Sequence, residues 1–237
     1  MNSPIRILIH GASGRMGQSL LRLASERSDL KVVAAVAREP GRVPNVAGAE
    51  CMAAADLEKV PAFDVAVDFS LPAGLDRLVA LCVSRRAALV SGTTGLEEAQ
   101  KLALDRASAQ IPVLWASNFS LGVAVLNDLV ERAAHALKGW DCDIVESHHV
   151  HKLDAPSGTA LTLGSHAQAG GAEPRYASLR AGDIVGEHLV QFTTLGERIE
   201  LVHRATNRDI FARGALHCAS RLAGRPAGQY RVRDLMD

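Results

Sequence analysis

The segment ESHHVHKLDAPSGTA, residues 146–160, contains the side chains of this chain best suited to chemistry, with three histidines, a lysine and an aspartate within nine residues. A histidine titrates near neutral pH, and crowding by other cations lowers the pKa of a lysine. If the chain turns after His149, His148 and Lys152 approach one face, and Asp154 can orient one of the two cations. This arrangement predicts a catalytic acid that delivers a proton.

The residues that follow predict a binding site for an anion. Pro156 and Ser157 are placed to begin a helix, with Ser157 as its N-cap. The backbone N–H groups of Gly158 and Thr159 then lie at the positive end of that helix, where a carboxylate binds well. A proton donor beside such a site suits a small anionic substrate that must receive a proton.

Two other interpretations of the segment remain open at this point. Glu146 and the histidines could ligate a metal, but successive strand residues point to opposite faces, and Lys152 would repel a cation. The segment could also be a capped, histidine-rich surface loop. We predict no metal site. The choice between a catalytic segment and a surface loop depends on the rest of the chain.

A glycine-rich turn near the start of the chain predicts a dinucleotide site. Gly11, Gly14 and Gly17 lie between an expected strand and an expected helix, where glycine permits a tight turn and lets a phosphate reach the backbone. At the end of the second strand, Ala37 cannot accept a hydrogen bond from a ribose, whereas Arg38 can pair with a 2′-phosphate. We expect use of both NADPH and NADH, with NADPH preferred, and a solvated surface arginine is the alternative.

The first half of the chain predicts a Rossmann-like, doubly wound parallel sheet. Apolar strands alternate with helices, which is typical of a parallel sheet covered on both faces. Loops at the carboxyl ends of such strands line the ligand crevice. The expected strands are 5–10, 31–37, 64–70, 87–92 and 111–117.

The pattern changes after Asn118. Residues 183–205 form two strand-like runs joined at 195–197, which predicts a hairpin. Adjacent strands without a crossover helix indicate a smaller α+β domain with a mixed sheet. We place the dinucleotide-binding domain at 1–118 and 207–237, and the substrate-binding domain at 119–206.

Composition narrows the class of protein. The chain has 237 residues, 48% of them hydrophobic, and a formal net charge of zero, which argues against nucleic acid as a partner. No apolar run reaches the length of a membrane span, and the start of the chain shows no signal-peptide pattern. Scattered cysteines without a CxxC pair predict reduced thiols in a cytoplasmic protein. They are Cys51, Cys82, Cys142 and Cys218.

Several short motifs resemble, in the same order, those of the 4-hydroxy-tetrahydrodipicolinate reductase (dihydrodipicolinate reductase) family. They are GASGRMG, VDFS, SGTTG, ASNFSLGV, ESHHVHKLDAPSGTA, RAGDIVGEH and FARGAL, and they extend over nearly the whole chain. The resemblance implies hydride transfer from NADPH or NADH to a cyclic dicarboxylate, with loss of water, in diaminopimelate and lysine biosynthesis. It also implies a homotetramer assembled through the substrate domains.

The resemblance also assigns roles by position. His148 matches the catalytic histidine of the family and Lys152 its proton-donating lysine. His149, Gly158 and Thr159 match residues that hold the substrate carboxylates. The residues that match cofactor positions are Gly11, Ala12, Ser13, Gly14, Arg15, Met16, Arg38, Gly92, Thr93, Thr94, Ser117, Asn118, Phe119 and Arg208.

Two features depart from the family pattern. Many members have an acid where this chain has Ala37, which argues against a strong preference for NADH. The expected loop at 170–180 is shorter than in longer members, which concerns the tetramer contact and not the chemistry.

Two rival functions would use the same first domain. A semialdehyde dehydrogenase needs a nucleophilic cysteine near the cofactor, and none of the cysteines lies in a motif-like loop. A non-catalytic, nucleotide-sensing regulator would have no reason to keep His148 and Lys152 beside an anion-binding helix start. We therefore predict an NAD(P)H-dependent oxidoreductase whose domains close about hinges at 118–119 and 207–208.

Overall fold

The computed structural model describes residues 3–46 and 48–236. Contacts within the chain divide it into two compact units. Unit 1 comprises Met1–Phe119 and Phe211–Asp237, and unit 2 comprises Ser120–Ile210. Residues 1 and 237, the two ends of the expected dinucleotide domain, lie outside the described residues.

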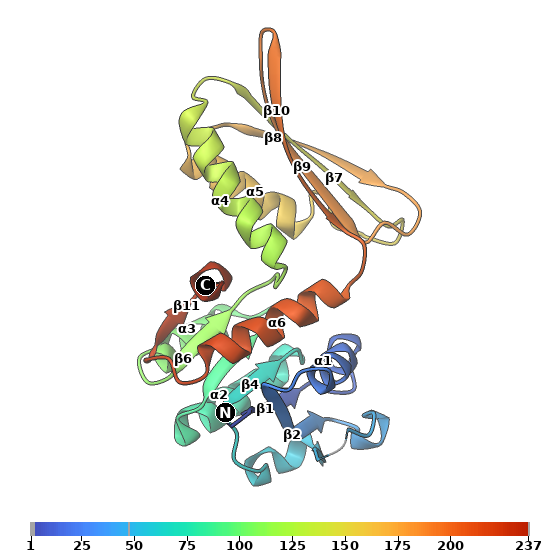
Figure 1. Ribbon diagram of the computed structural model, residues 1–237, viewed down its shortest axis with the longest axis vertical. Coiled ribbons are helices and arrows are strands. Elements are labelled where there is room, and N and C mark those ends of the chain that lie inside the picture. Colours follow the sequence, from blue (N-terminus) through green and yellow to red (C-terminus); the bar gives the residue numbers. More distant parts are fainter. Residues whose placement is uncertain (1–2, 47, 237) are drawn as a thin grey trace. The chain divides into compact units, whose positions relative to one another are not determined.

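Unit 1 is built on a seven-stranded parallel sheet with the order β11-β6-β5-β4-β1-β2-β3 (Figure 1). The strands are β1 (Ile5–His10), β2 (Leu30–Ala37), β3 (Glu50–Ala53), β4 (Val65–Asp68), β5 (Ala88–Ser91), β6 (Pro112–Trp115) and β11 (Gly228–Tyr230). β1 pairs with β2 on one side and with β4 on the other, so the strand order reverses next to β1. In sheets of this kind, ligands bind outside the carboxyl ends of the strands at that reversal.

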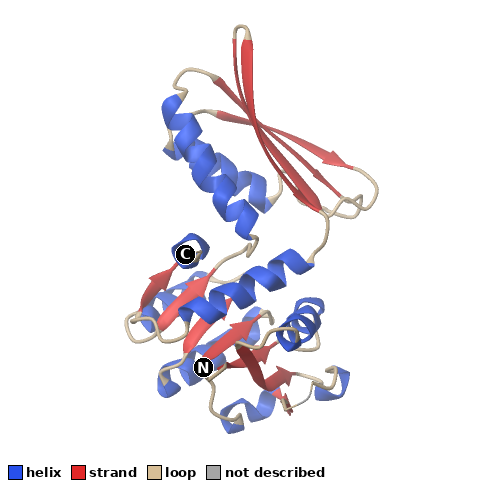
Figure 2. Ribbon diagram, in the orientation of Figure 1, coloured by secondary structure: helices blue, strands red, loops and turns tan. Residues whose placement is uncertain are grey.

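Helices flank the sheet of unit 1 on both faces (Figure 2). They are α1 (Arg15–Ser25), α2 (Pro72–Arg85), α3 (Glu98–Ser108) and α6 (Asp209–Leu222), with 3₁₀ turns η1 (Pro40–Arg42), η2 (Ala54–Lys59) and η3 (Val232–Leu235). On one face, Leu57 of η2, Leu78 of α2 and Leu104 of α3 join a buried cluster with alternate strand residues such as Leu8 and Ala66. This apolar packing fixes the strand ends that carry the glycine turn.

Unit 2 has a four-stranded mixed sheet with the order β10-β9-β7-β8. Its strands are β7 (Asp141–His148), β8 (Pro174–Arg180), β9 (Gly186–Thr194) and β10 (Glu197–Ala205), and its helices are α4 (Leu121–Ala136) and α5 (Gly158–Ala169). β7 pairs in parallel with β8 and antiparallel with β9. Both helices lie along one side of the sheet (Figure 1), where Val130 and Leu163 pack against Ile144 and Phe192.

Strand alternation decides which side chains of unit 2 face its helices. In β7, Cys142, Ile144, Glu146 and His148 are buried, and the residues between them are not. Glu146 is opposite His188 of β9, so the buried histidine of β9 faces the same side. The functional part of β7 therefore continues the apolar stripe that packs under α4 and α5.

The structure confirms the predicted fold class and the hairpin, which is formed by β9 and β10 with its turn at Leu195–Gly196. It corrects the expected loop at 170–180, because residues 174–180 form β8. It also adds β3 and β11 to the expected parallel strands. In the described part of the chain, no helix has both the length and the apolar character needed to cross a membrane.

Candidate active site

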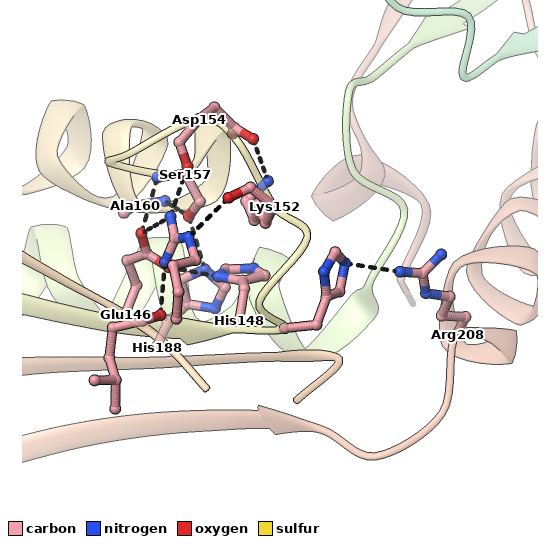
Figure 3. A network of polar contacts seen from close by, with 11 residues as sticks. Glu146, His148, Lys152, Asp154, Ser157, Ala160, His188 and Arg208 are labelled. Atoms are coloured by element: carbon pink, nitrogen blue, oxygen red, sulfur yellow. Dashed lines mark hydrogen bonds and ion pairs between the residues drawn. The ribbon is translucent and has the colours of Figure 1, made fainter. Parts of the chain in front are cut away.

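β7 carries two titratable side chains to the helix-facing side of unit 2. Glu146 and His148 are 1% and 8% exposed. Nδ1 of His148 is hydrogen-bonded to Oε2 of Glu146 (Figure 3). Because an ionised carboxylate can only accept, Nδ1 carries the proton of this bond, and Nε2 is the ring atom left for other partners.

The charges around this pair keep Glu146 ionised. Burial acts to raise the pKa of Glu146, but hydrogen bonds from Arg180, Ser178 and His148 outweigh it and lower the pKa to about 2. Burial is also the main cause that lowers the pKa of His148, and the charges of Lys152 and Arg180 add to it against the effect of Glu146. Near pH 7 the pair therefore consists of a carboxylate and a neutral imidazole.

The turn after β7 returns Lys152 toward the pair. The backbone N–H of Lys152 donates to the carbonyl of His149 at 3.1 Å, which closes a tight turn. Its Nζ lies 2.8 Å from Oδ1 of Asp154, and this hydrogen bond lowers the pKa of Asp154. Asp154 thus orients the lysine, as the sequence predicted.

The N-terminus of α5 begins beside the same carboxylate. Ser157 is the N-cap, and its Oγ accepts from the backbone N–H of Ala160 at 3.2 Å. The backbone N–H of Ser157 donates to Oε1 of Glu146 at 3.3 Å, and Oγ lies 3.2 Å from Nε2 of His188. Glu146 therefore holds both the histidine and the start of the helix (Figure 3). Gly158 is exposed, and a Cβ added there would meet no atom within 4 Å.

A second polar contact in unit 2 joins His149 to Arg208. Nη2 of Arg208 lies 3.1 Å from Nε2 of His149, so the arginine donates and Nδ1 of the ring carries the proton. That Nδ1 is buried and has no hydrogen-bond partner. Arg208 was expected to contact the cofactor, and the structure places it in unit 2 beside a residue expected to bind substrate.

The glycine turn of unit 1 is closely packed against its neighbours. Gly11 has φ +81°, and a Cβ there would lie 2.5 Å from the carbonyl oxygen of Phe69. A Cβ on Gly17 would lie 2.3 Å from the carbonyl oxygen of Gly11, so only glycine lets α1 approach the turn. Beside the turn is a cavity of about 430 Å³. Its lining includes Gly11, Ser13, Gly14, Ala37, Arg38, Phe69 and Arg77.

A buried polar network ties the strand ends under this cavity together. Asp68 at the end of β4 is fully buried and accepts from Oγ of Ser91 at 2.8 Å and Oγ1 of Thr93 at 2.7 Å. Its Oδ1 lies 2.9 Å from Nδ1 of His10, which lines the cavity. Burial acts to raise the pKa of Asp68, but the bonds from His10, Ser70 and Thr93 lower it overall. The sequence motifs did not reveal this network.

The other residues expected at cofactor positions gather in unit 1. Gly92 lies against Phe69, whose ring centroid is 5.5 Å from that of Phe119. A Cβ on Gly92 would lie 2.2 Å from the ring of Phe69, so glycine is required for this packing. Ala12, Arg15, Met16, Thr94, Ser117 and Asn118 also belong to unit 1.

Three of the four cysteines do not resemble the nucleophile of a semialdehyde dehydrogenase, and the fourth, Cys51 of β3, is exposed. Cys82, Cys142 and Cys218 are buried, and burial raises the pKa of Cys142 to about 11 and that of Cys218 to about 12. Such thiols are poor nucleophiles at neutral pH. Across residues 3–46 and 48–236, no group of three or more histidine, cysteine, aspartate or glutamate side chains is arranged to hold a metal ion.

Fold and site together define a class of protein. A Rossmann domain with a glycine turn binds NAD(P), and the attached mixed-sheet unit gathers a histidine, a lysine and an anion-favouring helix start. This combination is that of a two-domain, nicotinamide-dependent oxidoreductase.

Comparison with known proteins identifies the family. The models for dihydrodipicolinate reductase match residues 5–119 for its N-terminus and 122–236 for its C-terminus. The 4-hydroxy-tetrahydrodipicolinate reductase of Stenotrophomonas maltophilia (strain R551-3) is 70% identical over 238 residues, covering 99% of this chain and 98% of its own. That of Xylella fastidiosa (strain 9a5c) is 66% identical over 100% of both chains. The chain belongs to the dihydrodipicolinate reductase family, and its activity is 4-hydroxy-tetrahydrodipicolinate reduction in lysine biosynthesis.

Solved structures share the architecture at low sequence identity. Dipicolinate-bound dihydrodipicolinate reductase from Paenisporosarcina sp. TG-14 has a TM-score of 0.78 and 21% identity, covering 96% of this chain and 97% of its own. Myo-inositol 2-dehydrogenase from Lactobacillus plantarum has a TM-score of 0.65 and 10% identity, covering 98% of this chain and 93% of its own. The fold is thus shared with dehydrogenases of other substrates, so the chemistry has to be argued from the site.

Proposed function

We propose that unit 2 binds the two carboxylates of the substrate and that His148 and Lys152 supply the proton of the reaction. The reduction adds one hydride and one proton to the substrate and releases one water. The bound nicotinamide nucleotide supplies the hydride. The observation that supports our assignment is the hydrogen bond between Glu146 and Nδ1 of His148, because it leaves Nε2 of His148 free to exchange a proton with the substrate. Lys152, held by Asp154, lies on the turn that follows.

The charges of unit 2 suit a dianionic substrate. His149 and Arg208 form one polar pair, and Lys152 adds a second cation on the turn. We assign Gly158 and Thr159, in the first turn of α5, to a substrate carboxylate, because the positive end of a helix favours an anion. The exposed side of Gly158 leaves room for it, as no atom lies within 4 Å of a Cβ built there.

In unit 1, we assign the cofactor to the cavity beside the glycine turn. The cavity and the close contacts of Gly11 and Gly17 fit a nucleotide that approaches the backbone. Arg38 lines the cavity, and Ala37 offers no carboxylate to a ribose. These features favour NADPH over NADH. A cytoplasmic location is our further proposal, and it fits four cysteines that are all free.

We also propose a homotetramer that uses the side of the unit 2 sheet opposite its helices. Val145, Leu179 and Val202 alternate with helix-facing residues and are 36%, 53% and 41% exposed. The same face carries the ion pairs Arg175–Asp143 and Arg204–Glu187, and apolar side chains with polar neighbours of this kind are typical of a subunit contact. Sedimentation of wild type and Val202→Asp would test it, since the charged variant should dissociate; identical sedimentation of both would contradict this surface.

The experiment for the catalytic assignment compares two histidines of one motif. Nicotinamide oxidation is followed with the condensation product of pyruvate and aspartate semialdehyde as substrate. We expect His148→Asn to lower kcat by about 10²- to 10⁴-fold, the usual effect of losing an acid or base. The matched control is His151→Asn, an exposed histidine that should keep normal kcat. Equal kcat values in the two variants would remove His148 from the mechanism.

A further inference from the structure

We propose that Arg180 is a positioning residue that holds both proton carriers, His148 and Lys152, in one arrangement. The proposal rests on the catalytic roles proposed above. Arg180 is the last residue of β8 and is paired in register with His148 of β7. One guanidinium group contacts the partner of the histidine and the turn that carries the lysine.

The first contact fixes the histidine through Glu146. Nη2 of Arg180 donates to Oε1 at 2.7 Å, and Nη1 donates to Oε2 at 3.0 Å. This bidentate contact fixes the plane of the carboxylate, which a single hydrogen bond would not do. Because Oε2 also accepts from Nδ1 of His148, the orientation of the imidazole follows the orientation of the carboxylate.

The second contact fixes the turn that carries the lysine. Nη2 of Arg180 donates to the carbonyl oxygen of Asp154 at 2.6 Å, and Nε donates to that of Lys152 at 3.3 Å. Asp154 in turn holds Nζ of Lys152. The turn lies between β7 and α5. Its start is held by the backbone N–H of Val150, which donates to the carbonyl of Gly182 at 3.2 Å, and the bonds from Arg180 tie residues 152–154 to β8. A lysine has one ammonium group on a flexible stem and cannot reproduce this fork.

Arg180 also sets the electrostatics of the pair. Its charge balances the ionised Glu146 on a side of the sheet that also carries His188 and His203, with Lys152 and Asp154 on the turn. Removing the guanidinium charge removes one of the influences that lower the pKa of His148, whereas Glu146, with its pKa far below neutrality, stays ionised. The pKa of His148 should therefore rise.

Arg175 provides a matched control on the same strand. It makes the same kind of cross-strand contact, with Nε at 2.7 Å from Oδ1 and Nη2 at 3.0 Å from Oδ2 of Asp143 on β7. Asp143 is hydrogen-bonded to Arg175 and Gln191, whereas Glu146 is hydrogen-bonded to a histidine. Because the Arg175 pair is more exposed than the Arg180 pair, Arg175→Gln controls for the loss of a cross-strand arginine, and urea unfolding of Arg180→Gln measures any loss of stability separately.

The test measures kcat against pH, and the Kd of NADPH, in both glutamine variants. We expect Arg180→Gln to lower kcat by about 10²-fold, the cost of a small misplacement of a catalytic group. The pH at which kcat changes through the titration of His148 should be higher than in wild type. NADPH binding should be unchanged, and Arg175→Gln should match wild type throughout. If Arg180→Gln and Arg175→Gln have the same kcat and the same pH dependence of kcat, Arg180 has no positioning role.

Arg180→Lys separates the two contacts and also serves if the glutamine variant does not fold. This variant keeps the positive charge, so the pH dependence of kcat should match that of wild type. It loses the bonds from the guanidinium to the turn, so kcat itself should still be lower. A wild-type kcat in this variant would overturn the contact with the turn. Failure of the proposed function looks different: His148→Asn and Lys152→Ala would then keep normal kcat, whatever happens at Arg180.

Discussion

At the residue scale, we propose that two neighbours at the end of β2 determine the choice between NADPH and NADH. Ala37 is 2% exposed and brings no carboxylate to the cavity that Arg38 lines. The other arginine of this lining, Arg77, is held by both oxygens of Glu58, each at 2.7 Å. We therefore assign the 2′-phosphate of NADPH to Arg38.

Arg38→Ala should weaken NADPH and leave NADH nearly unchanged. A charge-assisted contact contributes about 1.5 to 3 kcal/mol when well formed. Since solvent screens this site, we expect a loss of roughly tenfold to a hundredfold in kcat/KM for NADPH. Arg42→Ala, an exposed arginine of the same loop paired with Glu39, is the control. Equal losses for both cofactors in Arg38→Ala would show that the arginine contacts the adenine, and the NADPH preference would be withdrawn.

His188 makes stability depend on pH. Burial, with the charges of His148 and His203, lowers the pKa of His188 to about 4. The unfolded chain takes up this proton near pH 6.5, before the folded protein does, so stability is full above pH 6.5 and falls as the pH drops toward 4.

Between pH 7 and 5, we expect wild-type unit 2 to lose on the order of 2 kcal/mol through His188. His188→Gln should lose less stability over the same pH range. Part of the pH dependence should remain, because the pKa values of His148 and His203 are also lowered in the folded protein. Urea unfolding followed by Trp140 in a Trp115→Phe background measures it, because Trp140 packs against the core of unit 2. The same pH dependence with and without His188 would disprove this account.

The sequence suggests which side chains react, but it does not show their partners. His148, Lys152 and Asp154 lie within one motif, so their spacing was enough to predict a proton donor. Arg180 is far along the chain, and only the register of β7 and β8 brings it to Glu146. The sequence alone suggests Glu146 only as a metal ligand, because it does not show which cation contacts a buried carboxylate.

At the scale of elements, we expect one substitution at the start of α5 to stabilise the protein and to weaken substrate binding. Gly158 occupies the first helical position, and its backbone leaves space around a Cβ. An alanine there lowers the conformational entropy of the unfolded chain, and its methyl group would not clash with a neighbour in the folded protein. Gly158→Ala should therefore raise the free energy of unfolding by about 0.4 to 1 kcal/mol. The methyl group would occupy the space that we assign to the substrate carboxylate.

We therefore expect Gly158→Ala to raise KM for the substrate while the Kd of NADPH stays the same. A larger residue, as in Gly158→Val, should raise KM further. Calorimetric titration with dipicolinate and with NADPH separates the two ligands. If NADPH affinity fell as much as dipicolinate affinity, α5 would belong to the cofactor site.

β8 shows which elements could not be predicted. Its residues PRYASLR are mostly exposed and mix charged, polar and apolar types, so the segment has no buried apolar run. Its strand conformation comes from pairing with β7 along its whole length. The parallel strands β1, β2, β4, β5 and β6 were predictable, because burial on both faces of a sheet requires continuous apolar runs.

At the scale of the whole molecule, we propose that the two units have separate tasks. The glycine turn, Arg38 and the His10–Asp68 network belong to unit 1, and the proton carriers belong to unit 2. Substitutions in one unit should therefore leave the ligand of the other unaffected. The hinges expected at 118–119 and 207–208 remain a prediction.

The most direct measurement is the single-turnover rate of Lys152→Ala with NADPH already bound, together with the Kd of NADPH. The account predicts a rate lower by about 10²- to 10⁴-fold, the range for a lost general acid. It also predicts an unchanged Kd, because Lys152 lies in unit 2. Lys138→Ala, at an exposed position just after α4, is the control for loss of a lysine in the same unit. A near-normal rate in Lys152→Ala, or a weakened Kd that accounts for the whole loss, would contradict the central claim.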